Sequence, residues 1–139
     1  MKRLQHSHEA VPFSPRLLRV FAVAALLLVP WVLWVAIHAA PPHHLGSRWN
    51  WAWGGLDVGE LIGLAVTAYL GRHRSAWVII AASATASLLL FDAWFDIWTA
   101  RSGFESWVSI WTASVIELPL SAALFWIAIR GVRFFTPKR

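Results

Sequence analysis

Four long apolar segments dominate the sequence and restrict the folds that it can adopt. They span residues 17–40, 54–71, 76–99 and 107–130, and short polar or proline-containing stretches separate them. At a rise of about 1.5 Å per residue, a helix of roughly 20 apolar residues crosses the hydrocarbon core of a bilayer. The composition agrees, because 58% of the residues are hydrophobic and only 14% are charged. The sequence therefore predicts an all-α integral membrane protein with four transmembrane helices in one domain at residues 16–133.

The basic residues gather at the ends of these segments and predict how the helices are oriented. With the amino terminus inside the cell, only Arg48 and Arg101 of the basic residues lie outside, which is a clear positive-inside bias. We therefore expect both termini in the cytoplasm, with a disordered tail at residues 1–15 and a basic tail at 134–139. Because the positive charges follow the segment ends and form no patch, we expect the lipid bilayer as partner and exclude nucleic acid. The residues placed inside are Lys2, Arg3, Arg16, Arg19, Arg72, Arg74, Arg130, Arg133, Lys138 and Arg139.

The first apolar segment has a second interpretation, as a cleaved signal peptide. Basic residues precede it and small residues close it, as in such peptides. However, the segment exceeds the usual apolar core of roughly 7–15 residues, and no clear small-x-small cleavage site precedes Pro41. We therefore favour a membrane helix with a kink near Pro30.

Acidic residues inside the predicted membrane segments are the strongest candidates for function. A carboxylate in hydrocarbon costs several kcal/mol unless it is paired, protonated or hydrated, so such residues usually face a bundle interior or a water-filled cavity. Counted from the outer end of each segment, all of them fall in the outer half of the bilayer. Helical periodicity also puts the acids of each segment on one face of its helix. Three helices thus bring Asp57, Glu60, Asp92, Asp96 and Glu117 into one layer.

Two of these acids also have a purely structural interpretation. Asp57 lies in the first turn of the second predicted helix, where a carboxylate satisfies free backbone N–H groups and the helix dipole. Asp96 is close enough in sequence to Arg101 to form a surface ion pair with it. The other three acids lie deeper, and no Lys or Arg falls inside any hydrocarbon span. We therefore expect the site to depend mainly on Glu60, Asp92 and Glu117.

Aromatic and small residues complete the predicted site and its surroundings. Trp94 and Trp98 neighbour the acids of the third segment, and under a regular helical period Trp111 shares a face with Glu117. We predict that these three tryptophans flank the carboxylates. Pairs of small residues at four-residue spacing predict close helix packing. The pairs are Gly59 and Gly63, Ala82 and Ala86, and Ser83 and Ser87.

Two short stretches carry a resemblance to known proteins. They are Phe91-Asp92-Ala93-Trp94-Phe95-Asp96 and Ile116-Glu117-Leu118-Pro119-Leu120. Over Gly54 to Val132 the chain resembles small bacterial membrane proteins with four predicted helices. The resemblance implies a four-helix fold in the bacterial cytoplasmic membrane. That family carries no assigned activity, so the resemblance supports the choice of residues and implies no function.

The balance of charge frames the functional hypotheses. Five carboxylates in a small volume of low dielectric cannot all be ionised without cations or protons among them. The permanent positive charges at their level are Arg48 and Arg101, which leaves a deficit. The histidines expected near that level, which add charge when protonated, are His38, His43 and His44.

Three hypotheses remain open for what supplies the missing positive charge. In the first, the cluster binds or translocates protons, a cation or a small cationic ligand, and because the chain is small for a complete pathway we expect it to act as a homo-oligomer. In the second, the protein is a scaffold or accessory subunit, and a partner membrane subunit supplies Lys or Arg. In the third, it is a lipid- or isoprenoid-modifying enzyme with carboxylate acid–base chemistry and tryptophan faces that stabilise a cation. No cofactor motif is present, although three carboxylates with or without His38 suit a divalent ion.

Overall fold

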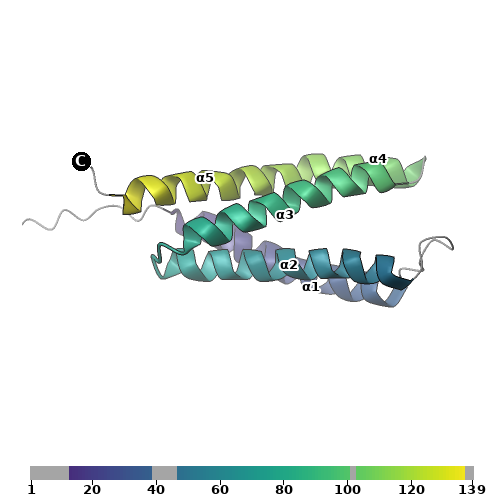
Figure 1. The fold of residues 1–139 in the computed structure, drawn as a ribbon, viewed down its shortest axis with the longest axis horizontal. Coiled ribbons are helices and arrows are strands. Elements are labelled where there is room, and N and C mark those ends of the chain that lie inside the picture. The colour runs from purple at the N-terminus through teal and green to yellow at the C-terminus, as the bar shows by residue number, and fades with distance from the viewer. Residues whose placement is uncertain (1–12, 39–46, 101–102, 137–139) are drawn as a thin grey trace, which may run out of the picture.

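The structure is a computed structural model that describes residues 13–38, 47–100 and 103–136, and all regular secondary structure in them is helical. The helices follow the chain in a simple order (Figure 1). Because α4, η1 and α5 follow one another without a break, they form one continuous helical rod. The elements are α1 (Pro15–His38), α2 (Ser47–Arg72), α3 (Val78–Thr99), α4 (Phe104–Thr112), the π-helical turn η1 (Ala113–Glu117) and α5 (Leu118–Phe135).

The observed helices extend beyond several predicted bounds. Helix α1 begins at Pro15 rather than 17, and Phe13 before it is fully buried. Helix α2 begins at Ser47, seven residues before the predicted start at 54, so its tryptophan-rich beginning is helical. Helix α5 continues to Phe135, past the predicted end at 130 and into the predicted basic tail. Most of the predicted amino-terminal tail, residues 1–12, lies outside the described residues.

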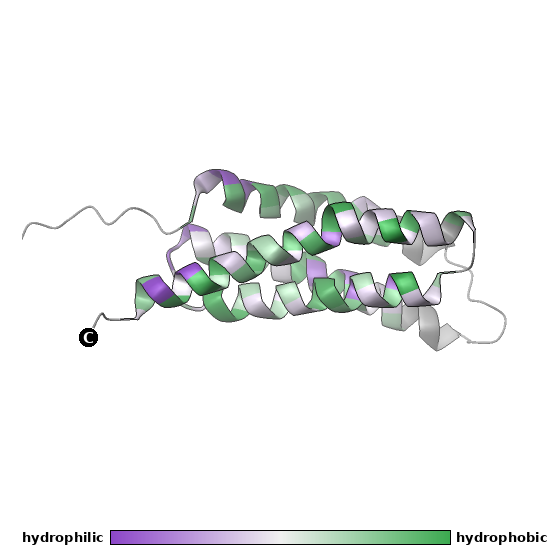
Figure 2. Ribbon diagram, turned by 90° about the horizontal axis from the view of Figure 1, so that it is seen from above, coloured by the Kyte–Doolittle hydropathy of each residue, from purple (hydrophilic) through white to green (hydrophobic). Residues whose placement is uncertain are grey.

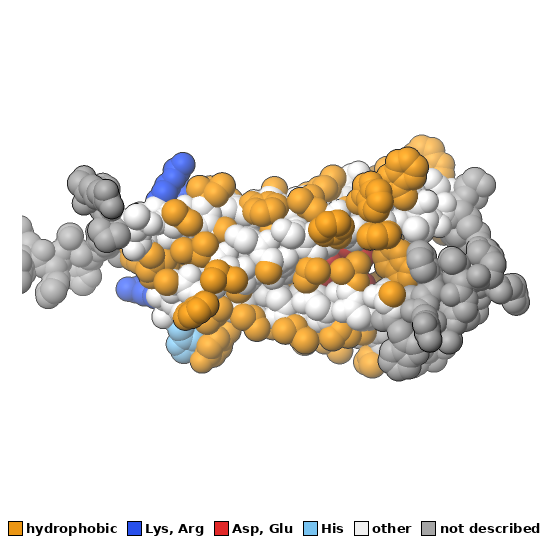
Figure 3. All heavy atoms as spheres, viewed as in Figure 1, with side chains coloured by type: hydrophobic (Ala, Val, Ile, Leu, Met, Phe, Trp, Pro, Cys, Tyr) orange, Lys and Arg blue, Asp and Glu red, His pale blue; other side chains and the backbone are white. Residues whose placement is uncertain are grey.

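Three of the helical rods are long and apolar enough to cross a membrane. They are Pro15–Leu33, Val78–Thr99 and Ser106–Phe135, so the predicted membrane-length helices are confirmed for three of the four segments. Large apolar side chains cover the outside of the bundle, as Figure 3 shows on one face. Such a surface is unusual for a soluble protein and normal where lipid tails replace water. Helix α2 is not among the three, and Asp57 and Glu60 interrupt its apolar run.

The helices pack in the order of the chain. Helix α1 lies along α2, α2 along α3, and α3 along the rod formed by α4, η1 and α5 (Figure 1). Because neighbours run in opposite directions, the beginning of α1 and the end of α5 lie at the same end of the bundle. The core between the rods contains fully buried aliphatic residues. Among them are Leu64 on α2, Val78 on α3, and Leu124 and Ile127 on α5.

Small residues bring α3 close to the helices on either side of it. Ala82 and Ala86 are fully buried, which confirms the predicted packing of that pair, whereas Ser87 is exposed. At Gly63 the backbone of α2 approaches α3 so closely that a methyl group there would collide with the Thr85 side chain. On the other side, the buried Ser121 hydroxyl of α5 donates a 2.9 Å hydrogen bond to the Ala86 carbonyl. These contacts fix the rotation of α3, and α3 carries two of the candidate acids.

Charged side chains separate into two regions of the bundle. All arginines whose side chains the structure describes lie at the end where α1 begins, α2 ends and α5 ends, which we call the arginine end. All described carboxylates lie in the other half. Figure 3 shows the blue and red side chains apart from each other, and Figure 2 shows hydrophilic residues concentrated near the C-terminus. The arginines are Arg16, Arg19, Arg72, Arg74, Arg130 and Arg133.

Candidate functional site

The five predicted carboxylates form one cluster, which we call the carboxylate cluster. It consists of two groups of three that share Asp92. Within each group, one carboxylate oxygen from every member lies within 4.8 Å of one oxygen from each of the others. The first group is Asp57, Glu60 and Asp92, and the second is Asp92, Asp96 and Glu117.

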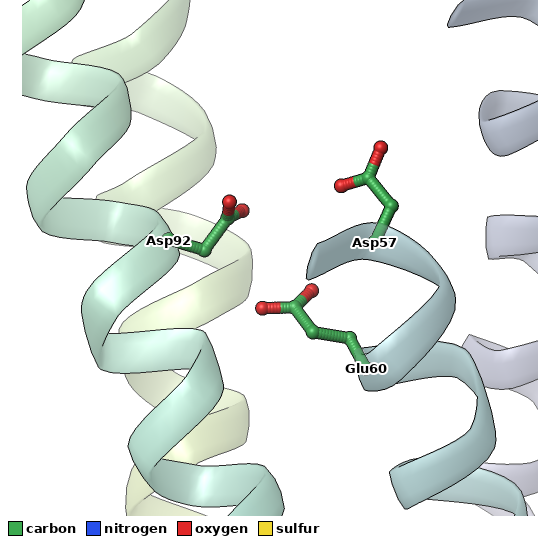
Figure 4. Close-up of side chains that lie close together, drawn as sticks. All are labelled: Asp57, Glu60 and Asp92. Atoms are coloured by element: carbon green, nitrogen blue, oxygen red, sulfur yellow. The ribbon is translucent and has the colours of Figure 1, made fainter. Parts of the chain in front are cut away.

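The first group bridges α2 and α3. Asp57 and Glu60 are three residues apart on α2, which puts both on the face toward α3. Their carboxylates and that of Asp92 point into the space between the two helices (Figure 4). Glu60 is 3% exposed and Asp92 is 8% exposed. Leu64 and Thr67 continue the same buried face of α2, as the helical period predicts.

The position of Asp57 excludes one of its two interpretations. Helix α2 begins at Ser47, so Asp57 lies ten residues inside the helix and not in its first turn. The expectation that it satisfies free N–H groups at a helix start is therefore wrong. Tryptophan-rich residues before the predicted start extend the helix, and this extension moves Asp57 into the buried part of the bundle.

The second group depends on the π-helical turn. In η1 the Leu118 N–H donates to the Ala113 carbonyl, a hydrogen bond that spans one residue more than in an α-helix. One extra residue rotates the preceding segment by roughly 100° relative to a regular helix. Glu117 and Ala113 are therefore both buried, whereas Trp111 and Ser114 point outward. The face predicted to be shared by Trp111 and Glu117 is therefore wrong, and a separation of six residues puts the two about 120° apart even in a regular helix.

The three predicted tryptophans are not brought into the carboxylate cluster. Trp94, Trp98 and Trp111 are 53%, 74% and 64% exposed. The Trp94 and Trp98 rings lie 6.2 Å apart on the exposed side of α3. Sequence analysis missed a different aromatic contact beside the acids, in which the Trp53 ring meets the Phe95 ring edge-on at 5.9 Å. The helical period already placed Trp53 on the same face as Asp57.

Several buried oxygens of this region lack a hydrogen-bond partner. They belong to Glu60 (Oε1), Asp92 (Oδ1) and Glu117 (Oε2), and Thr67 Oγ1 on α2 shares the property. An unsatisfied buried polar atom costs about 1–3 kcal/mol, and more when the group is charged. The three such atoms that belong to the cluster come from three helices and therefore indicate that the folded protein holds something else there: protons, water or a cation.

Positive charge is scarce around the cluster. In the part of the chain that the structure describes, every arginine side chain lies at the arginine end, and no lysine is present. The predicted pair of Asp96 with Arg101 lies outside the described residues, as do His43, His44 and the side chains of Arg48 and His38. Asp96 itself is half-buried, and it contributes an oxygen to the second group.

An apolar layer separates the cluster from the arginine end. Leu64 of α2, Leu89 of α3 and Leu124 of α5 are at most 2% exposed. Leu64 and Leu89 lie about one turn from Glu60 and Asp92 toward the arginine end, and Leu124 lies about two turns from Glu117. Apolar side chains thus lie between the cluster and the arginine end, and Figure 3 shows part of the red Asp and Glu side chains from the side of the bundle.

The ligand set has a clear chemical preference. Carboxylate oxygens are hard ligands, which suit Ca²⁺, Mg²⁺ and Mn²⁺ better than softer transition metals. Opposite oxygens around one Ca²⁺ are about 5 Å apart, so groups whose oxygens lie within 4.8 Å of one another have the right size. No known protein family, curated protein or solved structure matches this chain, and the chemistry of the site rests on these side chains.

Proposed function

We propose that this protein is a membrane protein whose carboxylate cluster binds a cation, with a hard divalent ion as the best fit. The observation that carries the proposal is the pair of carboxylate groups joined at Asp92, each with buried oxygens that lack partners. Such an arrangement is costly unless a positive species is present. A bound cation would satisfy both groups at once.

The proposal includes the membrane placement of the cluster. Helix α2 is the fourth membrane helix: its 26 residues reach about 39 Å, and it packs between α1 and α3. Its two acids face α3 and not lipid, so they do not oppose insertion. The positive-inside rule puts the arginine end, and with it both termini, in the cytoplasm. The carboxylate cluster then lies in the outer half of the membrane.

Binding is better supported than translocation across the membrane. A translocated ion would have to pass the layer of Leu64, Leu89 and Leu124, which is closed here. Opening that layer would separate α3 from two neighbours at the contacts made by Gly63 and Ser121. On the outer side, by contrast, Asp96 is half-buried and lies within one turn of the end of α3. We therefore assign the cluster one-sided access from the outside.

The direct test is titration of the purified full-length protein with Mn²⁺, followed by electron paramagnetic resonance, and with Ca²⁺ in competition. Wild type should bind Mn²⁺ and release it to Ca²⁺. Asp92→Asn removes the shared ligand charge from both groups and should weaken binding at least about 100-fold, as expected for loss of a ligand. Asp57→Asn and Glu117→Gln each alter one group and should have smaller effects.

Ser87→Ala is the matched control. Ser87 lies on α3 near Asp92, but it is exposed and its hydroxyl bonds only to the Ser83 carbonyl at 3.0 Å. This variant should bind as wild type does. Equal binding by wild type and Asp92→Asn would overturn the proposal, and so would a purified protein that binds no cation while remaining folded. A co-purified polypeptide that is lost in Asp92→Asn would instead favour the scaffold hypothesis.

A further inference from the structure

A second feature lies at the opposite end of the molecule, between α1 and α2. There the two helices leave a groove of about 770 Å³ that opens to the outside of the bundle. Alanines form its walls, with Ala22 and Ala25 on α1 and Ala65 and Ala68 on α2. Because alanine fills so little space, the groove exists although the helices are in contact nearby, where Leu18 packs against Gly71.

Three arginines line the mouth of this groove. Arg19 comes from α1, Arg72 from the last turn of α2, and Arg74 from the connection to α3. All three side chains are exposed, and every described carboxylate lies in the other half of the bundle. The guanidinium groups therefore face no acidic partner among the described residues. A groove with apolar walls and a cationic mouth matches an amphipathic anion.

The backbone conformation at Arg74 is a second, independent indication that the side chain of this residue has a role. Helix α2 ends in a Schellman motif, in which the Arg74 N–H donates to the Gly71 carbonyl and the Ser75 N–H to the Leu70 carbonyl. The residue at this position takes the left-handed conformation, and Arg74 has φ of 54°. Glycine is the usual residue there because a side chain is disfavoured at positive φ. The chain thus has a positively charged side chain at a position where the backbone conformation favours glycine.

We propose that the groove between α1 and α2 binds an anionic phospholipid of the surrounding membrane. The phosphate lies among Arg19, Arg72 and Arg74, and an acyl chain follows the alanine walls toward the middle of the bilayer. Basic pockets between membrane helices at the cytoplasmic face bind anionic lipid headgroups in this way. A free phosphate ion would use the arginines alone and leave the apolar walls uncovered, so the walls favour a lipid. This site is separate from the carboxylate cluster and does not depend on it.

Lipid retention by the purified full-length protein tests the proposal. Protein in mixed micelles of phosphatidylglycerol and phosphatidylcholine is passed through gel filtration, and the lipid bound per chain is measured by mass spectrometry. Wild type should retain phosphatidylglycerol selectively. Arg72→Gln and Arg74→Gly should each weaken retention roughly fivefold, the effect of removing one positive charge near an anionic surface. Arg74→Gly introduces the residue that the backbone favours, so its fold is secure.

Two further variants separate the groove from general surface charge. Arg133→Gln removes an arginine at the same end that does not line the groove, and it should retain lipid as wild type does. Ala65→Phe keeps all arginines but fills the groove from an exposed position, and it should lose the lipid. Equal losses in Arg133→Gln and Arg72→Gln, or full retention by folded Ala65→Phe, would overturn the proposal. So would displacement of the lipid by millimolar inorganic phosphate, which would show that the arginines recognise phosphate alone.

Discussion

The carboxylate cluster and the arginine end hold their charges in opposite ways. The carboxylates project into the contact between α2, α3 and the π-helical turn, where Glu60, Asp92 and Glu117 are buried. The arginines whose side chains the structure describes lie on the surface at or near helix ends, and all six are exposed. Exposed charges at the membrane interface remain hydrated and cost little. Buried charges without partners are costly, so the buried carboxylates need a functional explanation, whereas exposed arginines do not.

The difference shows which charges are informative about function. Arginines at helix ends are expected at the cytoplasmic side of any membrane protein, so under the proposed orientation only their placement around a groove carries further meaning. The buried carboxylates serve no such general purpose, and they oppose one another electrostatically. The apolar layer between the regions keeps the two separate. Each region can therefore be altered while the other serves as an internal control.

The largest predicted effect comes from placing a lysine at two buried positions that lie one turn apart on α2, one in the apolar layer and one in the carboxylate cluster. Leu64→Lys puts an ammonium group into the fully buried apolar layer, where it has no partner. An uncompensated buried charge costs about 3–5 kcal/mol, so this variant should unfold or aggregate. Glu60→Lys puts the same group one turn away among Asp57 and Asp92, where it supplies the missing positive charge. That variant should fold, with an unfolding free energy within about 1 kcal/mol of wild type.

Reversible unfolding in mixed detergent micelles, followed by circular dichroism, measures both variants. Glu60→Lys should in addition lose Mn²⁺ binding, because its ammonium group replaces the cation. If Glu60→Lys is as damaging as Leu64→Lys, the carboxylates are already neutralised in the folded protein, and the cluster does not lack a positive charge.

The next effect concerns the π-helical turn, which connects the exposed Trp111 with the buried Glu117. Deleting the exposed Val115 removes the extra residue and should convert η1 to a regular α-helix while the segments on either side keep their orientation. Trp111 should then stay on the outside of the bundle, and only the turn beside Glu117 should change. We expect at most roughly tenfold weaker Mn²⁺ binding, measured by electron paramagnetic resonance, as for loss of a supporting interaction.

Fluorescence quenching by brominated lipid checks this orientation. Trp111 contributes to quenching in wild type because it is 64% exposed. The difference in quenching between the parent and its Trp111→Phe variant should be the same in the deletion background. A smaller difference would mean that the deletion rotates α4 and that η1 does not accommodate one extra residue.

This turn also shows where sequence reasoning succeeds and where it stops. The period of 3.6 residues placed Asp57, Glu60 and Asp92 on facing surfaces of α2 and α3, because both helices are regular there. It failed for Trp111, because six residues of a regular helix already turn it about 120° from Glu117, and the extra residue of η1 adds a second shift in phase. Nothing in the local composition marks a π-helical turn. Pro119 has no backbone N–H and so leaves a carbonyl free near Val115, which indicates where the helix is disturbed but not that the disturbance is a π-helical turn.

The groove at the arginine end was not predicted for a related reason. Its walls consist of Ala22 and Ala25 on one helix and Ala65 and Ala68 on another, and these residues meet only when the two helices pack. In the sequence they are ordinary apolar positions. Likewise, the start of α2 was placed seven residues too late, because Gly54 and Gly55 resemble a helix boundary while the preceding tryptophans do not. Tertiary contacts and not local preference determine both features.

A smaller effect tests the contact that closes the bundle next to the carboxylates. Gly63→Ala would place a methyl group against the Thr85 side chain and should cost about 1–3 kcal/mol of unfolding free energy, as overpacking does. Gly59→Ala is the matched control on the same face. Its methyl group would lie 3.6 Å from Leu88, an ordinary contact, and the loss of glycine's freedom should stabilise by about 0.4–1 kcal/mol. Detergent unfolding should therefore show opposite signs, and equal signs would contradict the close approach at Thr85.

The smallest predicted effect is at the arginine end, and its sign is what matters. Arg74→Gly relieves a side chain at φ of 54° and should stabilise the lipid-free protein by about 1 kcal/mol. In micelles that contain phosphatidylglycerol the gain should shrink, because the variant loses part of the lipid binding that stabilises the folded state. Unfolding free energies of wild type and Arg74→Gly, each measured with and without that lipid, show how much of the gain from the relaxed backbone is offset by weaker lipid binding. An identical gain in both conditions would mean that Arg74 shapes the end of α2 and nothing else, whereas a reduced gain ties the strained backbone to the lipid that its side chain holds.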